Sequence, residues 1–109
     1  MDVVTPRRFE VYLVSFDPTL GAEIRKTRPA VIVSPDEANR HLRTVIVVPL
    51  TSASRGYPSR VAMRFQGRDG EAAIDQMRSI DRQRLVRRLG SIGSDAQRRL
   101  VEKLLEFFG

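Results

Sequence analysis

The sequence predicts a small, mostly β domain that ends in one α-helix. Short runs rich in Val and Ile recur along the first 93 residues, and Pro, Gly and Asp clusters separate them. From Ser94 onward, apolar residues recur at helical spacing instead. The 109 residues, 41% of them apolar, suit a single domain over 1–109 with a modest core. A barrel protects the edges of so many short strands best, although a sandwich fits the same periodicity.

Three strands are expected in the first half of the chain. They are Phe9–Phe16, Ala30–Ser34 and Arg43–Leu50. The first four residues of the second, Ala30–Val33, form a continuous apolar run, which is typical of a strand that is buried on both faces. Between the first two, Asp17–Gly21 predicts a turn, and a charged loop follows as far as Pro29. Pro35–Arg40 fits one turn of helix.

The second half predicts three more strands after a polar loop over Ala53–Ser59. These strands are Arg60–Phe65, Glu71–Ile80 and Leu85–Ile92. A turn over Gln66–Gly70 and a short helical turn over Asp81–Arg84 separate them.

A final helix is indicated by Ser94, a favourable N-cap residue, and by Gln97, which completes a capping box. Its apolar positions repeat at helical spacing: Ala96, Leu100, Val101, Leu104, Leu105 and Phe108. One face of this helix is therefore expected to pack on the core or on a second subunit.

Composition excludes several classes of site. The chain has no Cys, which rules out disulfides and thiolate metal sites and fits a reducing cytoplasm. His41 is the single histidine, so a histidine metal cluster is impossible. The N-terminus lacks the apolar core of a signal peptide, and no apolar run reaches membrane-spanning length. We therefore expect a cytoplasmic protein without membrane contact.

The net charge is +6, and most of the 19 basic residues are Arg. An Arg fork matches phosphate and stacks on bases, which favours nucleic acid as a partner, although a G+C-rich genome produces the same bias. Charges balance from Ser94 onward, so the positive excess lies in residues 1–93. Within that part, Gly21–Pro29 carries three cations and one carboxylate on a short loop that can grip a phosphodiester.

Four segments together resemble the MazF/PemK family of toxin endoribonucleases from bacterial type II toxin–antitoxin systems. The segments are Glu10–Gly21 with its Asp-Pro-Thr-x-Gly turn, Glu23 with Thr27–Ser34, Thr44–Ser52, and Asp75–Leu85. The resemblance implies a small SH3-like barrel with a C-terminal helix that acts as a homodimer. It implies cleavage of single-stranded RNA, usually mRNA, at short sequences without a metal or cofactor. It also carries the family's cleavage residues over to Arg28 and Thr51, and its loop glutamate to Glu23.

The chemistry of these three residues suits metal-free RNA cleavage. The 2′-OH attacks the neighbouring phosphate, so a proton must leave, charge on the phosphorane must be stabilised, and the leaving oxygen must be protonated. We expect Arg28 to stabilise the phosphorane, Thr51 to donate a hydrogen bond to it, and Glu23 to act as general base. Two simpler readings stay open: Arg28 as a surface ion-pair partner of Glu23, and Thr51 as a strand end.

Further residues are expected to bind RNA. Other family members have Gln and Gly residues where this chain has Ile24, Arg25 and Lys26, and we expect Arg25 and Lys26 to bind flanking phosphates. Arg55 and Tyr57 lie on a loop that either reads bases or closes over the site. The remaining candidates are Thr27, Ser52, Asp75, Gln76 and Arg78; for Asp75, bracing a turn is an equal alternative. One branch of the family has His and Arg where this chain has Ala22 and Ala73, so the acid–base arrangement of that branch is missing.

Two other functions remain open. One is a toxin of the same fold that poisons a protein such as DNA gyrase, without enzymatic activity; Arg28 and Thr51 argue against it. The other is a non-catalytic barrel that only binds nucleic acid. A toxin also implies an inhibitor, and we expect an acidic, MazE-like antitoxin that competes with RNA for the basic surface.

Overall fold

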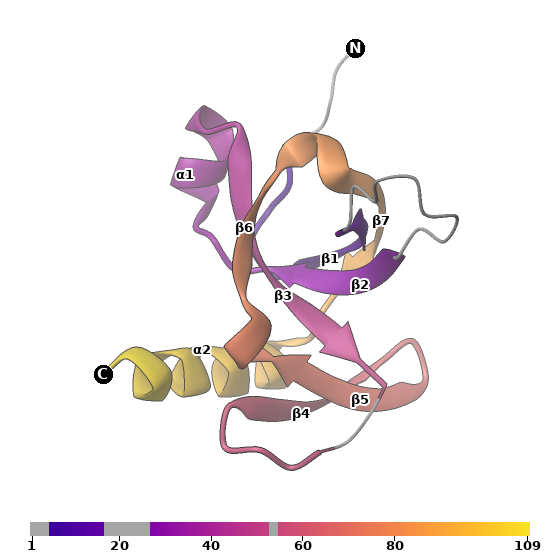
Figure 1. The fold of residues 1–109 in the computed structure, drawn as a ribbon, viewed down its shortest axis with the longest axis vertical. Coiled ribbons are helices and arrows are strands. Elements are labelled where there is room, and N and C mark those ends of the chain that lie inside the picture. Colours follow the sequence, from indigo (N-terminus) through magenta and orange to yellow (C-terminus); the bar gives the residue numbers. More distant parts are fainter. Residues whose placement is uncertain (1–4, 17–26, 53–54) are drawn as a thin grey trace.

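The computed structural model describes residues 5–16, 27–52 and 55–109 (Figure 1). Within them, seven antiparallel strands run in the order β4-β5-β3-β2-β1-β7, and β6 pairs with β3. The strands are β1 (Glu10–Ser15), β2 (Thr27–Ile32), β3 (Thr44–Thr51), β4 (Arg60–Phe65), β5 (Arg68–Ala73), β6 (Arg78–Asp81) and β7 (Leu85–Ser91). The helices are α1 (Asp36–His41) and α2 (Ser94–Phe108), with 3₁₀ turns η1 (Ile74–Gln76) and η2 (Arg82–Arg84). The expected β-rich architecture with a C-terminal helix is confirmed.

Strand β3 joins the two halves of the curved sheet. Its first residues pair with β6, and its middle pairs with β2 through Val47, Val48 and Pro49. Its last two residues, Leu50 and Thr51, pair instead with β5. The sheet therefore turns around the end of β3, which leads into the β4–β5 hairpin seen below it in Figure 1.

Two apolar clusters occupy opposite faces of the strands. The first includes Val11, Val31 and Val48, and Leu100 of α2 packs into it. The second contains Tyr12, which follows Val11 along β1, and Ala30, which precedes Val31 along β2. Successive strand residues point to opposite faces, so both faces of β2 are covered. The expectation that Ala30–Ser34 is buried throughout is confirmed.

The expectation of one continuous strand over Glu71–Ile80 is wrong. The chain forms β5, then η1, then β6, because β5 pairs with β4 and the end of β3, whereas β6 pairs with the start of β3. The change of direction occurs at Ile74, which is buried and donates its backbone N–H to the carbonyl of Ser59. The turn expected over 66–70 is also shorter, since β5 already begins at Arg68.

The capping box expected at the start of α2 is also wrong. Gly93 occupies the N-cap position, and Ser94 is already the first helical residue. The side chain of Gln97 donates to the carbonyl of Ile92 instead of reaching back to Ser94. Leu100 is buried, but Leu105 and Phe108, expected on the packed face, are both 68% exposed. In the described residues, no helix has the length and apolar character needed to cross a membrane.

Candidate active site

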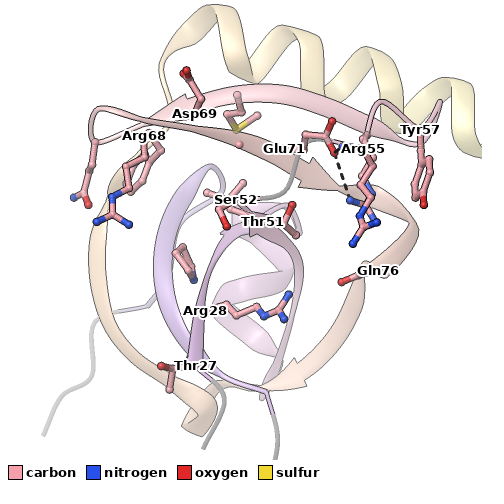
Figure 2. Close-up of a pocket in the computed structure, with 17 residues that line it drawn as sticks. Thr27, Arg28, Thr51, Ser52, Arg55, Tyr57, Arg68, Asp69, Glu71 and Gln76 are labelled. Atoms are coloured by element: carbon pink, nitrogen blue, oxygen red, sulfur yellow. Dashed lines mark hydrogen bonds and ion pairs between the residues drawn. The ribbon is translucent and has the colours of Figure 1, made fainter.

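A cavity of about 980 Å³ opens where β2 and the end of β3 meet the β4–β5 hairpin (Figure 2). Its walls come from β2, β3, β4, β5, the segment 55–57 and Gln76 of η1. The lining is rich in Arg, and Arg28, Arg55 and Arg68 are three of its side chains. Among the described residues, no three His, Cys, Asp or Glu side chains gather as metal ligands would. The cavity is thus suited to an anion.

Arg28 and Thr51 reach this cavity from adjacent strands. Strands β2 and β3 pair as far as Ala30 and Pro49, and Arg28 and Thr51 each lie two residues beyond that last pair, on β2 and β3 respectively. Both residues line the cavity, and Figure 2 shows the Arg28 side chain extending into the opening. The sequence placed Arg28 on a loop, which is wrong, because β2 begins at Thr27 and Arg28 pairs with Val14 of β1. Strand pairing fixes the backbone from which the Arg28 side chain extends.

Thr51 is held by the hairpin on its other side. It is the last residue of β3 and pairs with Glu71 of β5. It is half-buried, and Ser52, the next residue, is exposed and also lines the cavity. The strand end therefore presents two neighbouring hydroxyl groups to the cavity, either of which can donate to a phosphate oxygen.

A network of charged groups lies on one wall of the cavity. Arg60 donates to Asp75 through Nε at 2.8 Å, and its Nη1 lies 3.4 Å from the Glu71 carboxylate. The carboxylate of Glu71 accepts two backbone N–H bonds, from Arg55 at 3.1 Å and from Gly56 at 2.9 Å. The side chains of Arg60 and Glu71 are 6% and 5% exposed. One guanidinium thus bridges two carboxylates on this wall, and backbone N–H groups supply further donors to Glu71.

The surroundings of the two carboxylates in this network favour the ionised form. The backbone N–H groups of Gly56 and Arg55, followed by the Arg60 guanidinium, lower the pKa of Glu71. The hydrogen bond from Arg60 and then that from the Ser59 hydroxyl lower the pKa of Asp75. Because Asp75 is held by Arg60 and Ser59, the geometry favours the bracing role among the two that the sequence left open.

The structure brings together many of the residues expected from the sequence. The cavity lining includes Thr27, Arg28, Thr51, Ser52, Arg55, Tyr57 and Gln76. Asp75 and Arg78 are not part of the lining; the Arg78 guanidinium lies 5.5 Å from the centroid of the Phe16 ring. Glu23, Arg25 and Lys26 fall outside the described residues.

Sequence reasoning missed Arg60, Arg68 and Glu71, all of which line the cavity. For Arg68 the sequence held a local signal, the Gln66-Gly67 pair, which forms the turn of the β4–β5 hairpin. Gln66 and Gly67 both have positive φ, of 52° and 78°, as a two-residue hairpin turn requires. Such a turn makes Arg68 the first residue of β5, directly opposite Phe65. For Arg60 and Glu71 the signal appears only once β4 and β5 are paired.

Comparison with known proteins gives consistent matches over most of the chain. The family model for PemK-like, MazF-like toxins of type II toxin–antitoxin systems matches residues 7–108. The endoribonuclease toxin MazF of Escherichia coli K12 is 43% identical over 75 residues, covering 69% of this chain and 68% of that protein. The endoribonuclease MazF9 of Mycobacterium tuberculosis is 39% identical over 108 residues, covering 90% and 92%. A MazE–MazF crystal structure from Deinococcus radiodurans is similar with a TM-score of 0.84 and 28% identity, covering 98% of each chain.

Proposed function

The chain belongs to the PemK-like, MazF-like toxin family of type II toxin–antitoxin systems and is an endoribonuclease, and we propose that it cleaves single-stranded RNA at short sequences. We further propose that it acts in the cytoplasm, on mRNA, without a metal ion. The observation that carries this proposal is the convergence of Arg28 and Thr51 on one Arg-rich cavity from adjacent strands.

The proposed reaction is an internal displacement at phosphorus. The 2′-oxygen forms a bond to the adjacent phosphorus and loses its proton, the bond from phosphorus to the 5′-oxygen breaks, and that oxygen gains a proton. The products are a 2′,3′-cyclic phosphate and a 5′-OH end. Arg28 carries a fixed positive charge to the phosphorane, and the Thr51 hydroxyl donates to one of its oxygens. Glu23 is the proposed base.

RNA is proposed to enter across the lining of the same cavity. A volume of about 980 Å³ is at the upper end for a ligand pocket. Thr27, Ser52 and Gln76 supply polar groups at its walls, whereas Arg55 and Tyr57 supply a cation and an aromatic ring. Such a mixture suits phosphates and unstacked bases, which single-stranded RNA offers together.

A toxin needs an inhibitor, and the solved MazE–MazF complex of the Deinococcus protein supports one here. We propose that this chain forms a homodimer and binds an acidic, MazE-like antitoxin across the basic cavity. Co-expression with an adjacent acidic protein should give a stable complex in which RNA cleavage is blocked. Separate elution of the two proteins, with cleavage unchanged, would contradict the pairing.

The function is tested by incubating the purified protein with long single-stranded RNA in EDTA. Discrete fragments with 5′-OH ends are expected, and Arg28→Ala and Thr51→Ala should each reduce the cleavage rate by about 10² or more. Arg98→Ala, on the exposed surface of α2, is the charge-matched control and should cut normally. Intact but bound RNA would instead indicate a binding module. Intact, unbound RNA with inhibition of gyrase supercoiling would indicate a gyrase poison.

A further inference from the structure

The buried carboxylate of Glu71 binds the backbone of the segment 55–57, which carries Tyr57. Glu71 accepts the backbone N–H groups of both Arg55 and Gly56, at 3.1 and 2.9 Å. Its side chain is 5% exposed, whereas Arg55 and Gly56 are exposed. A buried carboxylate loses hydration and therefore depends on these donors and on Arg60. The position of the segment is thus tied to the charge of Glu71.

Arg60 fixes the same segment from its other end. Its guanidinium lies 5.1 Å from the centroid of the Tyr57 ring, and its backbone N–H donates to the Tyr57 carbonyl at 3.0 Å. The guanidinium is in turn held between Glu71 and Asp75. A cation over an aromatic face is attracted by the ring quadrupole, which favours this position of the ring. Arg60 therefore sets where the ring stands.

Tyr57 nevertheless remains available to a ligand. It is 49% exposed although it lines the cavity together with Arg28 and Thr51. Figure 2 shows the ring at the rim, beyond Arg55 and on the same side as Glu71. An aromatic ring that is half-exposed, fixed in place and beside a cationic cavity is the arrangement on which an unstacked base stacks.

We propose that Glu71 and Arg60 are positioning residues that hold Tyr57 as a stacking platform for a base flanking the scissile phosphate. The inference rests on the proposed RNA cleavage and extends it to the residues that position the platform. Neither residue needs to touch the reacting atoms. Their contribution therefore belongs to binding, so that their loss raises KM and leaves kcat nearly unchanged.

Amide hydrogen exchange tests, without any RNA, whether Glu71 holds the backbone of Arg55 and Gly56. In the wild-type protein the N–H groups of Arg55 and Gly56 should exchange slowly, because both are bonded to Glu71. Glu71→Ala should raise their exchange rates by at least 10-fold, whereas Glu71→Gln, which keeps one acceptor oxygen, should give an intermediate rate. Glu102→Gln on α2 is the matched exposed control. Equal exchange rates in the wild type and Glu71→Ala would refute the role of Glu71 in holding this backbone.

Binding tests the platform. The probe is the cleaved RNA sequence with a 2′-deoxy group at the cleavage site, in versions with one abasic residue at each position. For the wild type, one flanking abasic position should weaken binding by about 10-fold. Tyr57→Ala should weaken binding of the intact probe to the same extent and should no longer respond to that abasic position. Glu71→Ala should lose most of the same response, and Glu71→Gln should regain part of it.

Two results would overturn the proposal: an abasic response that persists undiminished in Tyr57→Ala, or one that persists in Glu71→Ala although its amides exchange freely. Thermal unfolding of each variant shows whether it is folded, and Glu71→Gln serves if Glu71→Ala is not. The proposed function fails separately, when the wild type leaves single-stranded RNA uncut. The inference alone fails when the wild type cuts RNA but Glu71→Ala binds and cuts it with unchanged KM.

Discussion

Gly70 lies directly against the main chain of Thr51. A Cβ atom built at Gly70 would overlap the Thr51 carbonyl oxygen and stand 3.2 Å from its carbonyl carbon. Real Cβ atoms do not approach backbone that closely, so any side chain at Gly70 must displace the end of β3. Thr51 therefore stands at the cavity because the neighbouring strand has no side chain at this point.

Gly70→Ala should accordingly damage both cleavage and stability. Overpacking of this kind costs about 1–3 kcal/mol of the free energy of unfolding, and displacement of Thr51 should lower the cleavage rate by at least 10-fold. Chemical denaturation and a fluorogenic RNA assay measure the two effects. Gly93→Ser is the control, because no atom lies within 4 Å of its new Cβ and Ser is favoured at an N-cap. A Gly70→Ala protein with full activity would contradict the close packing.

Thr51→Ser should separate the hydroxyl from the rest of the side chain. The Ser variant keeps a donor at the end of β3, whereas Thr51→Ala removes it. If the hydroxyl donates to the phosphorane, single-turnover rates should fall by about 10²–10³ for Ala but by much less for Ser. If Thr51 only ends a strand, the two variants should cut at similar rates, and the role in catalysis would be refuted.

Arg28→Lys tests whether charge alone suffices. The Arg fork donates to two phosphate oxygens, whereas an ammonium group acts as a point charge, so the Lys variant should lose most of the activity and retain more than Arg28→Ala. The measurement is the single-turnover cleavage rate with a defined RNA, and Arg98→Lys is the control. Because Arg28 lies at the open end of β2 and is only half-buried, thermal unfolding should change little in either variant. Equal rates for Arg28→Lys and the wild type would show that the positive charge suffices and that the two donors of the guanidinium are not required.

The sequence predicted those parts of the site that depend on local order. Arg28, Thr51 and Gln76 were recognised because each lies within a run of residues with a family pattern. The strand boundary at Thr27 was missed because Pro29 suggested the end of a loop, yet Pro29 is accommodated near the start of β2, where it pairs with Leu13. Proline has no backbone N–H, and it is tolerated there because few inter-strand hydrogen bonds form at the start of the strand.

Long-range relationships were not accessible in the same way. No Gly or Pro marks the break between Glu71 and Ile80, so only the strand pairing reveals it: β5 pairs with β4 and the end of β3, whereas β6 pairs with the start of β3. Likewise Arg60 and Glu71 become partners because β4 pairs with β5, which places Arg60 opposite Ala73. Patterns of exposed charge along one strand do not identify the strand that will supply the partner.

Acid should weaken the wall that Glu71 and Asp75 build with Arg60. Hydrogen bonds lower the pKa of both carboxyl groups below their ordinary values of 4.5 and 3.8. Groups of this kind stabilise the fold above the unfolded pKa and lose that contribution as pH falls through the folded pKa. Tm should therefore be insensitive to these groups at pH 6–7 and fall below about pH 4.5.

Glu71→Gln provides the comparison for this acid effect. It cannot ionise, so its Tm should lie below that of the wild type at pH 6–7, and the gap should narrow as the pH falls below about 4.5. Differential scanning calorimetry at several pH values measures the gap. A gap that stays constant down to pH 3 would show that ionised Glu71 does not stabilise the fold.

Arg68 should contact a phosphate that flanks the cleavage site. Figure 2 shows Arg68 and Arg55 at opposite edges of the cavity, with Arg28 between them in this view. A strand with its scissile phosphate at Arg28 would then carry neighbouring phosphates toward the two other cations. Each contact to single-stranded RNA contributes about 0.7 to the slope of log K against log salt concentration.

Arg68→Gln should therefore weaken binding of a non-cleavable RNA and make its salt slope shallower by about 0.7. The sequence hypothesis for Arg25 and Lys26 predicts a further decrease when both are changed to Gln. Fluorescence anisotropy from low to moderate salt measures these slopes. Arg98→Gln removes the same net charge from the exposed face of α2, where Arg98 is paired with Asp95, and should leave the slope unchanged. Equal slopes for Arg68→Gln and Arg98→Gln would mean that the Arg68 edge of the cavity meets no phosphate, and the path of the RNA would then have to leave the cavity on the Arg55 side alone.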